Sequence, residues 1–218
     1  MPSGGIDLRN RAWYNPELES RAYNVPGVIG LLILLMSLLL TSMSVVRERE
    51  MGTLDQLTVS PLSATELMLG KTLPPMLVAF VDLFLITGLA ILWFGIPMRG
   101  SFLVLMPAAL LYIIAALSMG LLISSVSRTQ QEAFMSLFLL LLPAIILSGF
   151  FYPISSMPRM FQWLTVLNPV RHFLEIVRAV FLKGAGFAPL WQQYLALALM
   201  AVGTAWVAVV RFRRTMAT

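Results

Sequence analysis

The chain has 218 residues, of which 59% are hydrophobic and only 11% are charged, and its formal net charge is +5 at pH 7. Soluble domains carry about 25% charged residues, so this composition excludes an ordinary soluble globular protein. Cysteine is absent, which excludes disulfides, thiol catalysis and thiolate metal sites. A basic excess on so apolar a chain reflects loops near lipid headgroups, so we expect no nucleic-acid partner.

Five stretches nearly free of charge follow a pre-membrane segment at residues 1–24, and about 20 such residues suffice to cross a bilayer as a helix. Backbone polar groups in hydrocarbon must be satisfied within the segment, so helices are expected. The sequence therefore predicts an all-α polytopic membrane domain over residues 25–218. Its predicted spans are residues 25–46, 72–95, 102–126, 134–150 and 190–210. The Pro26-Gly27 pair predicts a turn ahead of the first helix.

Residues 47–71 separate the first two predicted spans and hold seven charged residues. Residues 53–56 (TLDQ) have the spacing of a helix capping box, and residues 63–66 (SATE) repeat it beyond Pro61. We therefore predict a short helix near 53–59, a turn at Pro61, and a second helix that leads into span two. Such capped helices either prevent fraying at the membrane edge or present a small apolar face to a cytosolic partner.

Span two contains a single charged residue, Asp82, and its predicted start is Pro74-Pro75, a pair suited to the first turn of a helix. A carboxylate in a membrane helix usually faces protein or water. Two roles remain open for Asp82. It either serves proton transfer or contacts a cationic substrate, or it forms a structural hydrogen bond to a neighbouring helix.

Residues 151–183 are broken by three prolines, so we expect at least two short helices there. Three charged residues share one helical face at i, i+4 and i+7, opposite an apolar face: Arg171, Glu175 and Arg178. Such a segment lies at the outer interface, or dips into the membrane and returns. The sole histidine, His172, has no second ligand nearby in sequence, so packing or hydrogen bonding is expected of it and no metal site is predicted.

Five spans place the two termini on opposite sides of the membrane. With residues 47–71 in the cytosol, seven Lys and Arg lie inside and eight outside, so the charge count does not decide the orientation. The basic tail after the last span favours a cytosolic C-terminus. Because residues 1–24 contain no export signal, we expect an upstream transmembrane helix, either earlier in a longer chain or encoded separately.

Several motifs occur in an order that fits this membrane topology. They are R-E-R-E-x-G-T-x-D-x-L-x-x-S-P at 47–61, E-L-x-L-G-K at 66–71, S-x-x-S-R-T-Q-Q at 124–131, L-x-P-A-I-I-L-S-G-F-x-Y-P at 141–153 and L-N-P-V-R-H-F-L-E-I-x-R at 167–178. In these motifs the chain resembles the permeases of type-2 ABC exporters, and most closely bacterial multidrug-type permeases that work beside a periplasmic adaptor. That family usually has an earlier span and a large extracytoplasmic domain, of which residues 1–24 would be the remnant.

The resemblance implies a multi-pass permease of the bacterial inner membrane that exports hydrophobic or amphipathic, drug-like or lipid-like substrates. Its expected partners are ABC ATP-binding subunits, a second permease half in a homo- or heterodimer, a periplasmic adaptor and membrane lipid. No G-x-x-x-x-G-K-[ST] motif occurs, so we expect ATP and Mg²⁺ on the partner subunit, and neither enzymatic activity nor a bound cofactor on this chain.

The resemblance also implies two groups of site residues. Contact with the ATPase is expected in segment 47–71, at Arg47, Glu48, Glu50, Gly52, Thr53, Asp55, Leu57 and Pro61. A re-entrant segment near the exit is expected at Pro158, Asn168, Pro169, Arg171, Glu175 and Arg178. ATP-driven dimerisation of the partner would move segment 47–71 as a rigid lever. Two other functions remain open: a proton-coupled transporter that uses Asp82, and a non-transporting membrane scaffold.

Overall fold

The computed structural model describes residues 20–52 and 64–216 of the chain, with side chains over residues 24–52 and 66–211. All regular secondary structure in these residues is helical, which confirms the predicted all-α fold. The four long helices are α1 (Ser20–Glu50), α3 (Ala64–Leu92), α4 (Phe102–Val126) and α8 (Trp191–Met216). The shorter elements are α5 (Gln130–Ile146), η1 (Ile154–Ser156), α6 (Arg159–Thr165), α7 (Pro169–Arg178), the π-helical turn η2 (Ala179–Lys183) and η3 (Ala188–Leu190).

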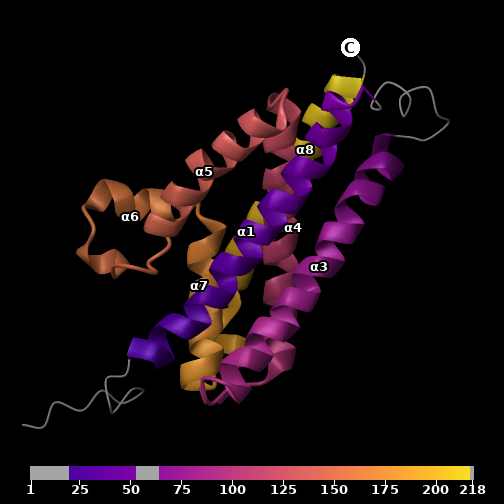
Figure 1. Cartoon of the computed structure of the whole chain (residues 1–218). Helices are drawn as coiled ribbons and strands as arrows, with labels where there is room; N and C mark the ends of the chain where they lie inside the picture. The colour runs from indigo at the N-terminus through magenta and orange to yellow at the C-terminus, as the bar shows by residue number, and fades with distance from the viewer. Residues whose placement is uncertain (1–19, 53–63, 217–218) are drawn as a thin grey trace, which may run out of the picture.

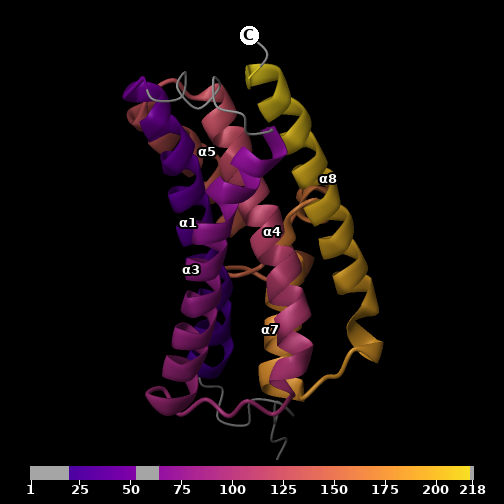
Figure 2. The same ribbon diagram turned by 90° about the vertical axis from the view of Figure 1, so that its right-hand side faces the viewer.

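The long helices form a bundle whose members run side by side (Figures 1 and 2). Four stretches are long and apolar enough to cross a membrane: Asn24–Glu50, Glu66–Leu92, Phe102–Val126 and Ala188–Arg211. The ends of α1, α4 and α8 and the starts of α3 and α5 gather at one end of the bundle, and the α3–α4 connection lies at the other. The chain is therefore a multi-pass membrane protein.

Two sequence-based expectations about proline differ from the structure. Pro26 lies inside α1, which already begins at Ser20, so no turn precedes the helix at that point. Pro74 and Pro75 lie well inside α3, which runs without a break from Ala64 into the second span. Membrane helices accept interior prolines because neighbouring groups and local adjustments satisfy the carbonyls that proline leaves free.

The fourth predicted span also differs from expectation. Residues 134–150 were expected to cross the membrane, whereas α5 begins at Gln130 and ends at Ile146 after 17 residues. A helix of this length rises about 25 Å, less than the roughly 30 Å of hydrocarbon in a bilayer. Beyond α5 the chain turns at Gly149, whose φ is 78°, and leads to α6, which lies to one side of the bundle (Figure 1).

One face of helix α7 is buried against the bundle. Its apolar face packs against α1, α4 and α8, and Phe173, Leu174, Ile176 and Val177 are all 0% exposed. At its start, the Asn168 side-chain amide donates to the carbonyl of Ala144 in α5 at 2.7 Å. This segment therefore packs against α1, α4, α5 and α8, and its depth in the membrane stays a prediction.

The outer end of α7 is held by the α3–α4 connection. The backbone N–H groups of Arg99 and Gly100 donate to the carbonyls of Phe181 and Val180 at 3.2 and 2.9 Å. These two carbonyls belong to the π-helical turn that follows α7. The connection therefore provides donors for carbonyl groups at a helix end, where the helix itself supplies none.

One buried aromatic side chain joins three helices in the core. Tyr112 of α4 is 0% exposed, and its hydroxyl donates to the carbonyl of Gly30 in α1 at 2.9 Å. Its ring stacks on Phe173 of α7 with centroids 4.3 Å apart. Further along, α4 approaches α1 closely at Gly120, where a Cβ atom would stand 2.9 Å from Cβ of Thr41. The core thus fixes α1, α4 and α7 relative to one another.

Candidate functional site at the end of helix α1

Glu48, near the end of α1, forms an ion pair with Lys71 of α3. The two side chains are only 21% and 22% exposed, so salt screens this pair less than an exposed surface pair. These residues lie on either side of the loop that joins the first two long helices. The ion pair therefore closes that loop at its base.

The next residue, Arg49, contacts a different helix. Its guanidinium donates to the carbonyl of Ser127 at 2.7 Å and to that of Ser124 at 3.4 Å, both at the end of α4. The last carbonyls of a helix lack intrahelical donors and carry the negative end of its dipole, so a cation is favourable there. Arg49 is absent from the residues that the sequence predicted for this site. The position of Arg49 in the R-E-R-E motif is its only signal in the sequence, because nothing in the sequence of α4 indicates that its carbonyls contact Arg49.

Glu50 contacts a third helix. Its carboxylate accepts from the backbone N–H of Gln130, the first residue of α5, at 2.9 Å, and also from the Gln130 side-chain amide. The first amides of a helix are free donors at the positive end of its dipole, and a carboxylate complements both properties. The structure thus places the start of α5 against the end of α1.

Gly52 terminates α1 in a left-handed conformation. Its φ is 69°, and its N–H donates to the carbonyl of Arg49 at 3.2 Å, as in a glycine helix cap. Arg47, one turn earlier, is exposed. The remaining predicted coupling residues, Thr53, Asp55, Leu57 and Pro61, lie outside the described residues, as do the predicted short helix near 53–59 and the turn at Pro61.

The residues predicted for the re-entrant segment occupy the opposite half of the bundle. Pro158 precedes α6, and Asn168 and Pro169 form the start of α7, where the Asn168 side chain accepts from the N–H of Val170. The three charged residues that were predicted to share one face of this helix do so. Arg171, Glu175 and Arg178 line part of a hollow of about 480 Å³.

Specific contacts hold this polar face. Nε of Arg171 lies 3.4 Å from Oε1 of Glu175, and Nε2 of Gln193 in α8 donates to Oε2 of the same carboxylate at 2.8 Å. Arg178 donates to the carbonyl of Gly149 at 3.1 Å. Sequence reasoning did not identify Gln193, because the contact depends on the packing of α8 beside α7.

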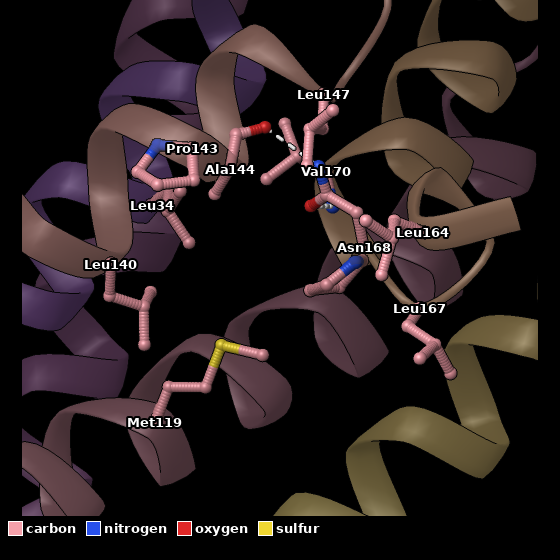
Figure 3. Close-up of a pocket in the computed structure, with 11 residues that line it drawn as sticks. Leu34, Met119, Leu140, Pro143, Ala144, Leu147, Leu164, Leu167, Asn168 and Val170 are labelled. Carbon is pink, nitrogen blue, oxygen red and sulfur yellow. Dashed lines mark hydrogen bonds between the residues drawn. The ribbon is translucent and has the colours of Figure 1, made fainter. Parts of the chain in front are cut away.

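A smaller apolar cavity of about 180 Å³ lies where α5 ends and α7 begins (Figure 3). Leu34 of α1, Met119 of α4, Leu140 of α5 and Leu167 before α7 contribute to its lining, with Asn168 at one side. Its walls offer contacts to a small apolar group and almost no polar ones. The cavity is separate from the charged contacts at the end of α1.

Asp82 and His172 are two further residues that the sequence singled out, Asp82 in the second span and His172 in the segment 151–183. Oδ2 of Asp82 is buried and has no hydrogen-bond partner among the described residues. Nε2 of His172 lies 3.0 Å from the carbonyl of Val166, which agrees with a hydrogen-bonding role. Within the part of the chain that the structure describes, no three His, Cys, Asp or Glu side chains gather as a metal site would require.

Comparison with known proteins places these features in a family. The model of the ABC-2 type transporter family matches residues 9–182. Three similar proteins of Escherichia coli (strain K12) are the probable multidrug ABC transporter permeases YbhR and YbhS and the inner membrane transport permease YhhJ, which are 38%, 34% and 32% identical to this chain. The alignments cover 95%, 93% and 98% of this chain and 56%, 55% and 57% of those proteins, so the chain spans little more than half their length. The family match over most of the chain, together with these relatives, shows that the chain belongs to the ABC-2 type transporter family.

Proposed function

We propose that this chain is the membrane-spanning permease part of an ATP-driven exporter that moves hydrophobic or amphipathic substrates out of the cytoplasm. ATP and Mg²⁺ are bound and used by a separate ABC subunit. Membership of the ABC-2 family and relatives named as multidrug ABC transporter permeases support this proposal. Because the chain spans little more than half the length of those relatives, the activity and partners of the complete transporter belong to the proposal as well.

The observation that carries the proposal is the set of contacts at the end of α1. We call the pairs Glu48–Lys71, Arg49–Ser127 and Glu50–Gln130 the coupling clamp. Through the clamp, one turn of α1 is tied to α3, α4 and α5. A force on the connection between α1 and α3 therefore displaces the ends of four helices together.

Such a displacement suits the transmission of work across a membrane. Helices are stiff along their axes, and bundles switch between packed arrangements by rigid-body movement. Closure of an ATP-binding subunit against the segment that begins at Gly52 would move the clamp, and the bundle would transmit that movement to its outer half. Flexible loops without such contacts would absorb the same displacement.

Exposed apolar side chains on the bundle support two further partners, membrane lipid and a second permease half. Leu77 and Val81 of α3 and Leu139 of α5 are between 61% and 79% exposed, as suits contact with lipid or with a second permease half. The relative named as an inner membrane permease supports the bacterial inner membrane as the location. A periplasmic adaptor is proposed on the resemblance to multidrug permeases alone.

The proposal is tested by purifying the tagged protein from its native membranes in mild detergent and identifying the retained proteins by mass spectrometry. We expect an ABC ATP-binding subunit to be retained, and to be lost on Gly52→Trp. Gly95→Trp is the matched control, because Gly95 also has positive φ, 64°, and open space around it, but it lies in the α3–α4 connection at the other end. Recovery of the chain without an ATP-binding subunit, or equal loss in both variants, would refute the proposal.

A proton-coupled transporter remains a second candidate, because the buried Oδ2 of Asp82 has no hydrogen-bond partner among the described residues. A carboxylate in that position is suited to binding a proton. This candidate predicts transport that stops with an ionophore and continues without ATP.

A further inference from the structure

Two neighbouring hollows lie on the polar side of α6 and α7. One, of about 480 Å³, is formed by α7, the start of α8 and the chain that follows α5, and the other, of about 460 Å³, by α6 and α7. Both are lined by Arg171 and Ile154, so they adjoin at these two residues. We call the two hollows together the outer basin and define it by their charged and amide-bearing lining: Arg159, Gln162, Arg171, Glu175, Arg178, Lys183 and Gln193.

The lining of the outer basin is predominantly cationic. Four of its side chains are Arg or Lys and one is a carboxylate, Glu175. Both oxygens of this carboxylate are already engaged, one by Arg171 at 3.4 Å and the other by Gln193 at 2.8 Å. Only 11% of the chain is charged, so four cations around one recess represent a marked local concentration.

The surroundings of the basin are apolar and aromatic. Large side chains near its edge are exposed by 62% at Phe151, 66% at Tyr152, 78% at Trp163 and 80% at Met160. Trp and Tyr favour the depth of lipid headgroups, where their rings contact acyl chains and their polar atoms reach water. A cationic recess beside such a surface complements a molecule with an anionic head and an apolar tail.

The basin lies toward the end of the bundle opposite the coupling clamp. The element that follows α7 hydrogen-bonds to Arg99 and Gly100 in the α3–α4 connection, and the clamp joins the other ends of α1, α3 and α4 (Figures 1 and 2). With the clamp on the cytosolic side, the basin faces the outer leaflet. Guanidinium groups bind phosphate oxygens with paired hydrogen bonds, and basic pockets between membrane helices bind phospholipid headgroups.

We propose that the outer basin binds the headgroup phosphate of an anionic phospholipid of the outer leaflet. The phosphate lies between Arg159 and Arg171, and the acyl chains extend over the aromatic edge near Trp163. This lipid is a bound component of the permease. The proposal depends on the membrane orientation and not on which energy source drives transport.

The test is native mass spectrometry of the detergent-purified protein with added phosphatidylglycerol or phosphatidylcholine of identical acyl chains. We expect preferential retention of phosphatidylglycerol, and a loss of about fivefold in its binding for each arginine replaced in Arg159→Gln and Arg171→Gln. Arg128→Gln is the control, because Arg128 is an exposed arginine that does not line the basin and lies near the other end of the bundle. Arg171→Lys retains the charge and should restore part of the binding.

Three results would overturn the proposal. The first is equal retention of the two lipids, and the second is an equal loss in Arg128→Gln, which would indicate general surface attraction. The third is complete displacement of the lipid by millimolar inorganic phosphate, which would assign the basin to free anions. Arg159 is exposed on α6, so Arg159→Gln is expected to fold normally, and its thermal unfolding checks this. Because the readout needs no ATP-binding subunit, its failure is distinct from failure of the export proposal.

Discussion

The guanidinium of Arg49 donates to the carbonyl of Ser127, 78 residues later in the chain, at 2.7 Å. This bond joins the end of α1 to the end of α4 and places a cation on carbonyls that α4 cannot satisfy itself. A hydrogen bond to a charged group contributes about 1.5–3 kcal/mol, which is enough to hold two helix ends together during a conformational change.

We expect Arg49→Met to weaken coupling while leaving membrane insertion intact. Methionine keeps an apolar stem and removes the cation, so the end of α4 is no longer held to α1. The measurement is the ratio of transport to ATP hydrolysis in the reconstituted transporter. Arg47→Met is the control, because Arg47 is exposed on the same helix turn. An unchanged ratio in Arg49→Met would remove Arg49 from the coupling clamp.

Reversal of charge at Glu50 is expected to uncouple the transporter. In Glu50→Lys, an ammonium group would replace the carboxylate beside the N-terminus of α5, where the helix dipole favours negative charge. Glu50→Gln retains an acceptor for the N–H of Gln130 and should preserve more of the coupling. Transport and ATP hydrolysis measured together distinguish the two variants. Equal coupling in both would show that charge at this position is unimportant.

Substitution of Gly52 tests the conformation that ends α1. Its φ of 69° costs an ordinary L-residue about 1–2 kcal/mol, whereas Asn adopts this region more readily. Among the described residues, a Cβ atom at this position would meet nothing within 4 Å, so contacts within that part of the chain do not distinguish the two side chains. We therefore expect lower coupling in Gly52→Val than in Gly52→Asn, judged by the ratio of transport to ATP hydrolysis. The reverse order would contradict a requirement for positive φ.

Loss of the Tyr112 hydroxyl should destabilise the bundle modestly. The hydroxyl donates to the carbonyl of Gly30 at 2.9 Å in a fully buried position. Tyr112→Phe keeps the stack on Phe173, so the expected loss is about 0.5–1.5 kcal/mol in thermal unfolding in detergent. Tyr152→Phe, at a tyrosine that is 66% exposed, should leave the transition unchanged. Equal stability of Tyr112→Phe and the unmodified protein would mean that this bond contributes nothing.

Two glycines in membrane helices should respond oppositely to alanine. A Cβ at Gly120 would stand 2.9 Å from Cβ of Thr41 and 3.2 Å from the carbonyl oxygen of Leu38, whereas a Cβ at Gly88 would meet none of the described residues within 4 Å. Overpacking costs about 1–3 kcal/mol, so Gly120→Ala should lower the unfolding temperature. Gly88→Ala removes a poor helix former and should raise stability by up to about 1 kcal/mol. The same detergent unfolding assay measures both, and equal shifts would contradict the close approach of α1 and α4.

Asp82→Asn separates the two candidate energy sources. If ATP drives export, the amide should support transport close to the unmodified rate, because no proton has to bind there. Transport is measured in vesicles with ATP and an ionophore present. Complete loss of transport, with ATP hydrolysis and folding retained, would favour the proton-coupled alternative.

The sequence predicted the helical class and the positions of the long helices well, because charge is excluded from hydrocarbon over entire spans. It did not predict that α7 is buried. The charged face of Arg171, Glu175 and Arg178 suggested an interface with water, whereas it lines a recess that the start of α8 and the chain after α5 help to form. Periodicity reveals that a helix has a polar face, but it does not reveal what that face contacts.

The coupling clamp was only partly predictable for a related reason. The R-E-R-E motif indicated that the end of α1 matters, and Glu48 and Glu50 were identified from it. The partner of Arg49 is a set of backbone carbonyls on α4, and backbone groups leave no signature in the side-chain sequence. Pro26, Pro74 and Pro75 also led to wrong predictions of where helices begin. Proline disrupts the interior of a helix in water, but membrane helices tolerate it.

The burial of α7 also bears on how the protein is assembled. Its start is hydrogen-bonded to α5, its end to the α3–α4 connection, and α1, α4 and α8 surround it. The 10 residues of α7 and the 5 of the π-helical turn that follows it are together fewer than the about 20 that a span requires. During synthesis, α7 therefore finds its place only against helices made earlier, and it is enclosed when α8, the helix made after it, enters the membrane.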